Sequence, residues 1–213
     1  MITISNCEVY GLEAAIRGMR NPMNSWDKSD TIFGFFSSQV DIGGNDLALM
    51  QKLVLAGDDH AKFLRFITVT LDITAPLYWW KQFDQYKVGT ITNSCSTMHK
   101  IHAKEFTLDD FSHEHLCGDT EHRDIDEPVG ILNIVIDALN CARNDYLETK
   151  DKIYWWQMIQ LLPSSYNQTR TVQLNYQVLK SMYFSRRNHK LDEWREFCLW
   201  CETLPYFKEI ISE

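Results

Sequence analysis

The chain contains 213 residues, of which 45% are hydrophobic and 13% are aromatic, so it is long enough to bury one sizeable core. Its formal net charge of -8 argues against a protein that binds nucleic acid or an anionic membrane surface non-specifically, because such proteins carry a basic field. A pocket with a local positive charge could still bind a small anionic ligand.

The N-terminal residues from Met1 to Asn6 carry neither the basic flank nor the apolar segment of a signal peptide, and no apolar run approaches the roughly 20 residues of a membrane span. We therefore expect a cytoplasmic protein with no membrane partner. A chain of this size in a reducing compartment does not need disulfides. We expect free thiols at all six cysteines, which are Cys7, Cys95, Cys117, Cys141, Cys198 and Cys201.

The N-terminal part of the sequence predicts a strand, two helices and a second strand in turn. Residues 2–10 form the expected first strand, and residues 12–19 form the first helix. The stretch Gly43 to Asp46 is a typical helix start, and the apolar residues after it repeat at helical spacing as far as Gly57. From Phe66 to Ile73, β-branched residues and partial alternation favour a half-buried strand.

A helix and a polar loop are expected to follow this strand. Pro76 suits the first turn of a helix rich in aromatic residues. A glycine then ends that helix, and the stretch Gly89 to Thr97 has the composition of a polar loop. Residues 102–127 are rich in His, Asp and Glu, so we expect an exposed excursion with one short helix from Thr107 to Phe111.

The remainder of the sequence predicts mainly helices. Pro128 opens the strongest one, whose apolar residues follow i, i+3, i+4, i+7 spacing. Because no repeat or low-complexity linker interrupts the pattern, we expect one α+β domain over residues 1–213. The elements expected after the Pro128 helix are an aromatic-rich helix that ends before Pro163, a short strand from Thr171 to Asn175, and helices centred on residues 179–186 and 191–204.

The order of features from His60 to Lys100 resembles that of the flavin-dependent thymidylate synthase family. In that family a strand runs into Ala-Pro, a helix follows, and the end of the helix carries the signature Arg-His-Arg-x-x-Ser-x-Asn-Glu-x-Ser-x-Arg-Tyr. Here a strand runs into Thr74-Ala75-Pro76, and an aromatic helix with Gln82 follows. The stretch that aligns with the signature without gaps extends from Gln85 to Met98, and most of its letters are replaced.

A second block of the sequence resembles the family between residues 160 and 205. With residues 45–101, this block defines the extent of the resemblance. The family's succession of Leu-Pro, Val-Asn, Leu-Arg and Gln-Trp-Glu is followed here by Leu161-Leu162-Pro163, Val172 to Asn175, Ser185-Arg186-Arg187 and Trp194.

The resemblance implies a small antiparallel sheet packed with helices, assembled as a homotetramer with FAD bound between subunits. It implies reductive methylation of dUMP, or of a related pyrimidine nucleotide, with methylenetetrahydrofolate as carbon donor and NADPH as reductant. In that chemistry the flavin carries the hydride, and the protein positions the rings and neutralises the phosphates.

The same resemblance assigns the site residues one by one. Arg186, Arg187 and Lys87 are expected to bind the phosphate. Gln82 and Asn93 are expected to contact the base or sugar, and His60 and Asn175 the flavin. The cofactor set is His60, Tyr86, Lys87 and Asn175, and the substrate set is Gln82, Gln85, Asn93, Ser94, Cys95, Thr97, Arg186 and Arg187.

The departures from the signature favour a second hypothesis, in which the protein keeps the fold and binds or sequesters a nucleotide or nucleotide-derived ligand without methylating it. Three signature arginines stand here as Gln85, Lys87 and Thr97, so the loop loses two charges and all its bidentate donors. Asn93 replaces the signature Glu. An enzyme that acts on dUMP, or on a different pyrimidine, is the other hypothesis. It is favoured by the retained residues His60, Gln82, Asn175, Arg186 and Arg187. Lys100 and Arg170 are further cations that could compensate for the lost arginines in binding a nucleotide.

Cys95 replaces the second Ser of the signature and has two interpretations. A thiol in a polar loop near a helix end can have a lowered pKa and attack an electrophilic ring carbon. Alternatively, Cys95 is a small loop residue that replaces a Ser of nearly equal size.

Four other groups of residues each have a chemical and a structural interpretation. His113, His115, Cys117 and His122 are zinc-ligand types, but their spacing matches no common structural site, and a solvated polar segment explains them, so we expect no metal. The remaining groups are a redox pair or two buried thiols (Cys198, Cys201), ligand-stacking or core aromatics (Trp79-Trp80, Trp155-Trp156), and phosphate-binding or surface residues (His99, Lys100, His102).

Overall fold

The computed structural model describes residues 1–34, 40–121 and 124–212. Its contacts divide the chain into two compact units, each built from several segments. Unit 1 comprises Met1–Thr3, Thr74–Phe83 and Asn93–Arg170, and unit 2 comprises Ile4–Ile73, Asp84–Thr92 and Thr171–Glu213.

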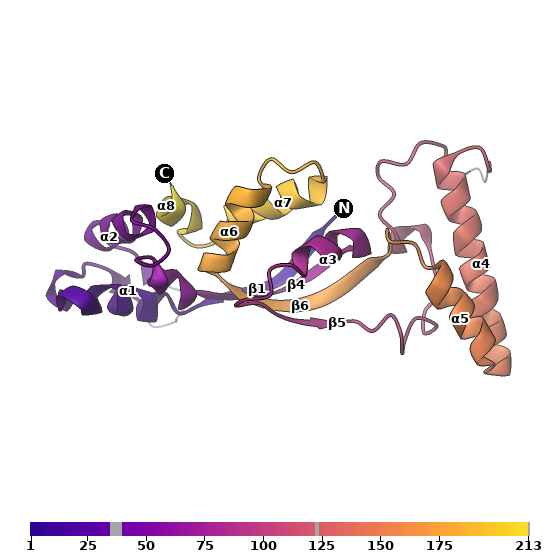
Figure 1. Cartoon of the computed structure of the whole chain (residues 1–213), viewed down its shortest axis with the longest axis horizontal. Helices are drawn as coiled ribbons and strands as arrows, with labels where there is room; N and C mark the ends of the chain where they lie inside the picture. Colours follow the sequence, from indigo (N-terminus) through magenta and orange to yellow (C-terminus); the bar gives the residue numbers. More distant parts are fainter. Residues whose placement is uncertain (35–39, 122–123, 213) are drawn as a thin grey trace. The chain divides into compact units, whose positions relative to one another are not determined.

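Within the described residues, the strands form one four-stranded sheet and one two-stranded sheet, and Figure 1 labels the strands of the larger sheet. In the larger sheet the order is β1-β4-β6-β5, so that β1 and β5 are the edge strands. In the smaller sheet β2 (Ile32–Phe33) pairs antiparallel with β3 (Val40–Asp41). The strands of the larger sheet are β1 (Thr3–Tyr10), β4 (Thr68–Pro76), β5 (Ile91–Ser94) and β6 (Asn167–Asn175).

Strand β4 shows why this sequence forms a sheet. Its residues alternate between buried and half-buried, and the buried set begins with Val69, Leu71 and Ile73. Two side-chain contacts to β6 fix the strand direction. The hydroxyls of Thr74 and Thr169 lie 2.7 Å apart, and Thr171 donates to Asp72 at 2.6 Å. Residue numbers rise along β4 as they fall along β6, so the two strands are antiparallel, as the resemblance implied.

Unit 2 contains five of the α-helices, and they bury a core of large side chains that includes Met50, Leu64 and Phe207. Helix α1 follows β1 directly, as predicted. The helices are α1 (Leu12–Arg20), α2 (Gly44–Leu55), α6 (Tyr176–Arg186), α7 (Asp192–Cys201) and α8 (Phe207–Ile211), with short 3-10 turns at Asn21–Met23, Trp26–Lys28 and Lys62–Arg65.

A buried carboxylate holds the segment between α1 and α2. Asp46 is 0% exposed and accepts hydrogen bonds from Arg20 Nε at 2.6 Å and from the Ser29 hydroxyl at 2.7 Å. The hydroxyl and the backbone N–H of Thr31 donate to the same carboxylate. Burial alone disfavours the charged form, but the hydrogen bonds outweigh it and hold the pKa of Asp46 below its ordinary value.

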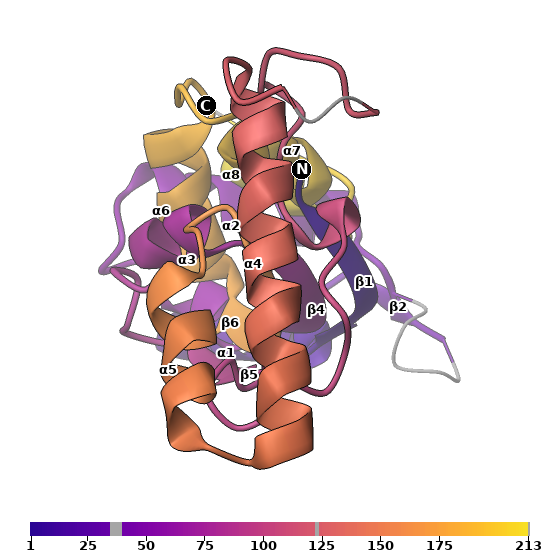
Figure 2. The same ribbon diagram turned by 90° about the vertical axis from the view of Figure 1, so that its right-hand side faces the viewer.

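Unit 1 is built on a helical hairpin and an apolar cluster to which both helices of the hairpin contribute. Figures 1 and 2 show α4 (Pro128–Thr149) and α5 (Lys152–Leu161) side by side. Proline at the first position starts α4, and the Asp151 side chain caps α5 by accepting from Ile153 N–H at 3.0 Å. Helix α3 (Leu77–Phe83) and the 3-10 turn Leu108–Asp110 also belong to this unit, together with parts of β4, β5 and β6. The cluster contains Ile101, Phe106, Phe111, Leu132, Ile136, Leu139, Ala142 and Met158.

Several sequence expectations about local structure were wrong. The predicted loop Gly89 to Thr97 contains strand β5, because backbone pairing with β6 overrides its polar composition. Helix α3 ends at Phe83, before the glycine expected to stop it. The segment 102–127 is not an exposed excursion throughout, since Phe106 and Phe111 are buried. Strand β6 begins four residues before its predicted start, and α8 was not predicted.

Pro76, expected in the first turn of a helix, is instead the last residue of β4, and α3 begins one residue later. The other predicted helices and strands are confirmed within a few residues at their ends, and so is the α+β class. The single-domain organisation stays a prediction. All six cysteines are free thiols. Within the described ranges, no helix is both long and apolar enough to cross a membrane.

Candidate functional site

In unit 2, the loop that follows α3 lies along helix α6. At one end of the helix, a Cβ added to Gly89 would lie 3.0 Å from Asn175 Nδ2 and 3.3 Å from a methyl group of Val178. Gly89 also has a φ of 79°, which favours glycine. At the other end, Arg186 Nε donates to the Tyr86 hydroxyl at 3.0 Å. The loop aligned with the start of the family signature and Arg186 are therefore neighbours.

The Arg186 guanidinium is held by two aromatic rings. Its Cζ atom lies 5.0 Å from the ring centroid of Trp194 and 5.7 Å from that of Tyr86. The two rings meet edge to face with centroids 6.1 Å apart, and Trp194 is fully buried. Cation–π contact with buried aromatics fixes both the position and the plane of the guanidinium. A half-buried, oriented arginine of this kind suits bidentate recognition of a phosphate.

His189 lies beside this cluster and was not identified from the sequence. Its Nδ1 accepts a hydrogen bond from Leu191 N–H at 3.1 Å, and its ring centroid is 6.4 Å from that of Trp194. Burial, Arg186 and Arg195 lower the pKa of His189 below its ordinary value. The imidazole is thus neutral at pH 7 and adds no charge beside Arg186. The sequence signal that could have identified His189 is its position three residues after Arg186.

Arg187 has different surroundings from Arg186. It is exposed, and its Cζ atom lies 5.1 Å from the ring centroid of Phe184. It lines a cavity of about 150 Å³ together with Glu202 and Lys208. In that cavity Glu202 accepts from Tyr183 at 2.6 Å and from Lys208 at 2.8 Å. The resemblance to the family assigns both arginines the phosphate role, and of the two it is Arg186 that is held against Tyr86 of the loop.

Asn175 has a clear structural role at the start of α6. Its Oδ1 accepts from Val178 N–H at 3.1 Å, which is an N-cap hydrogen bond. Its Nδ2 faces Gly89 of the loop. The flavin contact expected for Asn175 stays a prediction.

The other candidates in unit 2 are exposed. His60 follows α2 in a turn, where its backbone N–H donates to Gly57 O at 2.9 Å. Gln85 and Lys87 lie on the loop on either side of Tyr86, and their side chains are exposed. Because these side chains are not packed in the core, they are accessible to a ligand.

In unit 1, the backbone of Cys95 is fixed against strand β6. Its N–H donates to Thr169 O at 2.9 Å, and its carbonyl accepts from Gln168 Nε2 at 2.8 Å. The Cys95 residue is exposed. A solvent-accessible thiol on a fixed backbone is compatible with either interpretation made from the sequence.

Gln168 connects Cys95 to a cation in unit 1. The Gln168 Oε1 atom accepts from Arg170 Nε at 3.0 Å, and the Arg170 Cζ atom lies 4.2 Å from the ring centroid of Trp80. Trp80 in turn donates its indole N–H to Gln168 O at 2.9 Å. Gln168 was missed because no pattern in the sequence marks a buried glutamine on a strand. Trp80 is a core residue, as the structural interpretation of the tryptophan pair predicted.

The remaining candidates in unit 1 lie on α3, on β5 and in the segment that follows β5. Asn93 and Ser94 are exposed at its end, while Gln82 on α3 and Thr97 after β5 are half-buried. Of the possible phosphate contacts, His99 and Lys100 are exposed, and His102 packs edge to face on Tyr146 with ring centroids 4.9 Å apart.

The possible metal and redox sites receive no support from the described residues. No group of three or more His, Cys, Asp or Glu side chains in the described part of the chain can hold a metal ion, and His122 lies outside it. Cys198 and Cys201 are buried in α7. Burial raises the pKa of Cys198 to about 11 and raises that of Cys201 as well, as expected for inert thiols.

No protein-family model matches the chain, and no curated protein matches it by sequence. By structure, the chain has the fold of the flavin-dependent thymidylate synthases, as the sequence implied. The thymidylate synthase ThyX of Helicobacter pylori, solved with FAD and dUMP, matches with a TM-score of 0.69 and 15% identity over 100% of this chain and 98% of its own. A second structure of ThyX from Helicobacter pylori, also complexed with FAD and dUMP, matches with a TM-score of 0.67 and 15% identity over 100% and 97%.

A third match is the UMP/dUMP methylase PolB from Streptomyces cacaoi bound with 5-Br dUMP. Its TM-score is 0.59, with 14% identity over 100% of this chain and 95% of its own. At these identities the likeness is one of fold.

Proposed function

We propose that the chain binds FAD and a pyrimidine nucleotide and catalyses reductive methylation of dUMP, or of a closely related nucleotide, with methylenetetrahydrofolate and NADPH as cosubstrates. The observation that carries this proposal is the Arg186 guanidinium, held by Tyr86 and Trp194 beside the loop that replaces the family signature. The fold it shares with proteins solved with FAD, dUMP and 5-Br dUMP supports it.

The proposed ligand contacts are those that the resemblance to the family assigns. Arg186 binds the nucleotide phosphate, with the exposed Lys87 as a second cation, and Gln82, Gln85, Asn93, Ser94 and Thr97 contact the base or sugar. The cofactor residues are His60, Tyr86, Lys87 and Asn175. Their imidazole, phenol, ammonium and amide groups fit the carbonyls and diphosphate of FAD. FAD, when bound, supplies the hydride chemistry.

Cys95 is proposed as the covalent group. Its exposure allows a thiolate to approach the pyrimidine ring, and the backbone hydrogen bonds to β6 hold it in place. The test is rescue of a thymidine auxotroph by the wild type and by Cys95→Ser, with Cys141→Ser as control because Cys141 is also an exposed thiol. Loss of rescue in Cys95→Ser alone is expected. Equal rescue by all three proteins removes the nucleophile role.

The alternative is a protein that binds a nucleotide without methylating it. The exposed loop side chains Gln85 and Lys87 favour it, because they stand where the family has arginines, and neither can form a bidentate pair with phosphate. Arg186 would then be the residue that recognises the phosphate, without help from loop arginines.

Purified protein distinguishes these functions. A flavin absorbance band, or saturable binding of added FAD, is expected for the enzyme, together with saturable binding of dUMP. Binding of dUMP without FAD identifies the alternative. Protein that binds neither FAD, dUMP nor UMP contradicts both functions.

We also propose a cytoplasmic homotetramer in which each chain is one domain. Light scattering after gel filtration is expected to give four times the 25.0 kDa of one chain. A monomer at micromolar concentration would contradict the proposed assembly.

A further inference from the structure

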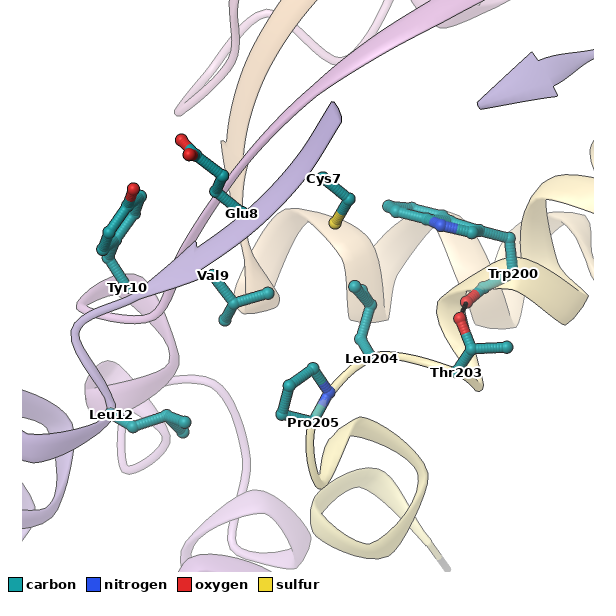
Figure 3. Close-up of a pocket in the computed structure, with 9 residues that line it drawn as sticks. All are labelled: Cys7, Glu8, Val9, Tyr10, Leu12, Trp200, Thr203, Leu204 and Pro205. Carbon is teal, nitrogen blue, oxygen red and sulfur yellow. Dashed lines mark hydrogen bonds between the residues drawn. The ribbon is translucent and has the colours of Figure 1, made fainter. Parts of the chain in front are cut away.

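Unit 2 contains a pocket that the proposed function does not use. It lies between strand β1 and the chain around the end of α7, and its volume is about 550 Å³ (Figure 3). Small-molecule sites occupy roughly 300–1,000 Å³. The apolar part of the lining consists of Val9, Leu12, Trp200, Leu204 and Pro205.

The two walls of the pocket come from segments far apart in the sequence. Figure 3 shows Cys7 and Val9 on the side of β1 that faces Leu204, while Glu8 and Tyr10 lie on its other side. This arrangement follows from the alternation of side chains along a strand. The opposite wall carries the indole of Trp200, which is half-buried and therefore keeps part of its surface accessible.

The lining offers an anion no cationic partner. None of the nine lining residues is Lys or Arg, and the charged Glu8 lies on the other side of β1 from Cys7 and Val9 (Figure 3). Burial and the nearby Glu8 raise the pKa of the Cys7 thiol, so this sulfur stays protonated at neutral pH. Thr203 donates its hydroxyl to Trp200 O at 2.7 Å, which leaves its oxygen as an acceptor. FAD, pyrimidine nucleotides and folates are all anions, so they do not suit this pocket.

We propose that this pocket binds a small, uncharged, largely aromatic molecule, which stacks on Trp200 and packs against Leu204 and Pro205. The binding is driven by burial of apolar surface, and the Thr203 hydroxyl and the Cys7 thiol supply its weak polar contacts. This ligand belongs to a different chemical class from the nucleotide and cofactor proposed above, so the inference does not depend on that function.

Fluorescence of N-phenyl-1-naphthylamine, a neutral aromatic probe, tests the proposal on the full-length protein. Saturable 1:1 enhancement is expected for the wild type. The anionic probe 8-anilinonaphthalene-1-sulfonate is expected to bind at least tenfold more weakly. Cys7→Trp fills the pocket from β1 and should weaken N-phenyl-1-naphthylamine binding at least tenfold. Leu199→Trp is the matched control, because Leu199 is 63% exposed on the same helix as Trp200 but does not line the pocket. Equal binding by both variants, or absence of saturable enhancement in the wild type, overturns the proposal.

Alkylation of the wild-type protein gives an independent test, because it does not depend on whether a variant folds. Saturating N-phenyl-1-naphthylamine should slow iodoacetamide modification of Cys7 at least fivefold, measured peptide by peptide by mass spectrometry. The exposed Cys117 and Cys141 provide internal controls, because they lie in unit 1 and do not line the pocket. Unchanged modification of Cys7, or equal slowing at all three cysteines, overturns the proposal.

Discussion

The Nε–H of Arg186 donates a 3.0 Å hydrogen bond to the phenol oxygen of Tyr86, which joins the end of α6 to the loop aligned with the family signature. An arginine at a helix C-terminus can also be explained by the helix dipole. That explanation does not require two aromatic rings around the guanidinium, whereas recognition of a planar anion benefits from a fixed guanidinium plane. Arg186 is therefore the residue on which the proposed nucleotide site depends most.

Tyr86→Phe removes the hydroxyl acceptor and keeps the ring. Because a hydrogen bond to a charged group contributes about 1.5 kcal/mol, we expect dUMP to bind roughly tenfold more weakly. Isothermal titration calorimetry measures the change. Tyr10→Phe serves as a control, since Tyr10 lies on β1 of the same unit and its hydroxyl interacts with Glu8. Unchanged dUMP affinity in Tyr86→Phe would show that Tyr86 does not orient Arg186 for binding.

Arg186→Ala and Arg187→Ala form a matched pair of adjacent charge deletions. Loss of a half-buried, phosphate-binding guanidinium costs about 2–3 kcal/mol, so Arg186→Ala should weaken dUMP binding roughly 30- to 100-fold. Arg187 is exposed and lies against Phe184, so its loss should change the affinity by less than about threefold. The opposite ranking would transfer the phosphate role to Arg187.

Much of the fold was predictable because its elements carry strong local patterns. The alternation of Val69, Leu71 and Ile73 predicted β4, and Pro128 marked the start of α4. Strand β5 was not predictable from composition, since Ile91 to Ser94 form a strand only by pairing with a segment some 75 residues later. The five-residue α8 was missed because it is too short for a periodic pattern.

The site was predictable as a set of residues but not as an arrangement. The sequence could not separate Arg186 from Arg187, because their different surroundings arise from Tyr86 and Trp194 on one side and Phe184 on the other. Gln168 carried no signal, since its hydrogen bonds to Arg170 and Cys95 depend on sheet pairing.

Cys198 and Cys201 are expected to resist modification in the native protein. With a pKa of about 11, the Cys198 thiol is only about 0.1% thiolate at pH 8, and Cys201 is fully buried. Reaction with 5,5′-dithiobis(2-nitrobenzoic acid) should therefore detect at most the four exposed thiols quickly and all six after unfolding in guanidinium chloride. Fast reaction of six thiols in the native protein would contradict the burial of this pair.

Asp46→Asn should destabilise the protein by about 3 kcal/mol at pH 7, because it removes one partner of a buried ion pair and leaves Arg20 without its carboxylate. The pKa of Asp46 is lowered in the folded state. Its ionised form therefore stabilises the protein fully above the unfolded pKa, and this contribution is lost as the pH falls through the lower folded value. Urea denaturation at pH 7 and at decreasing pH below about 4 measures the difference between variant and wild type, which should shrink with the pH.

Asp58→Asn is the matched control for Asp46→Asn. Asp58 also forms an ion pair, with Lys180 at 2.7 Å, and its pKa is also lowered, but its side chain is 63% exposed. Solvent screens an exposed pair, so this variant should lose less than about 1 kcal/mol at pH 7. Burial rather than pairing then accounts for the larger effect at Asp46. Equal losses in the two variants would show that burial does not set the size of the effect at Asp46.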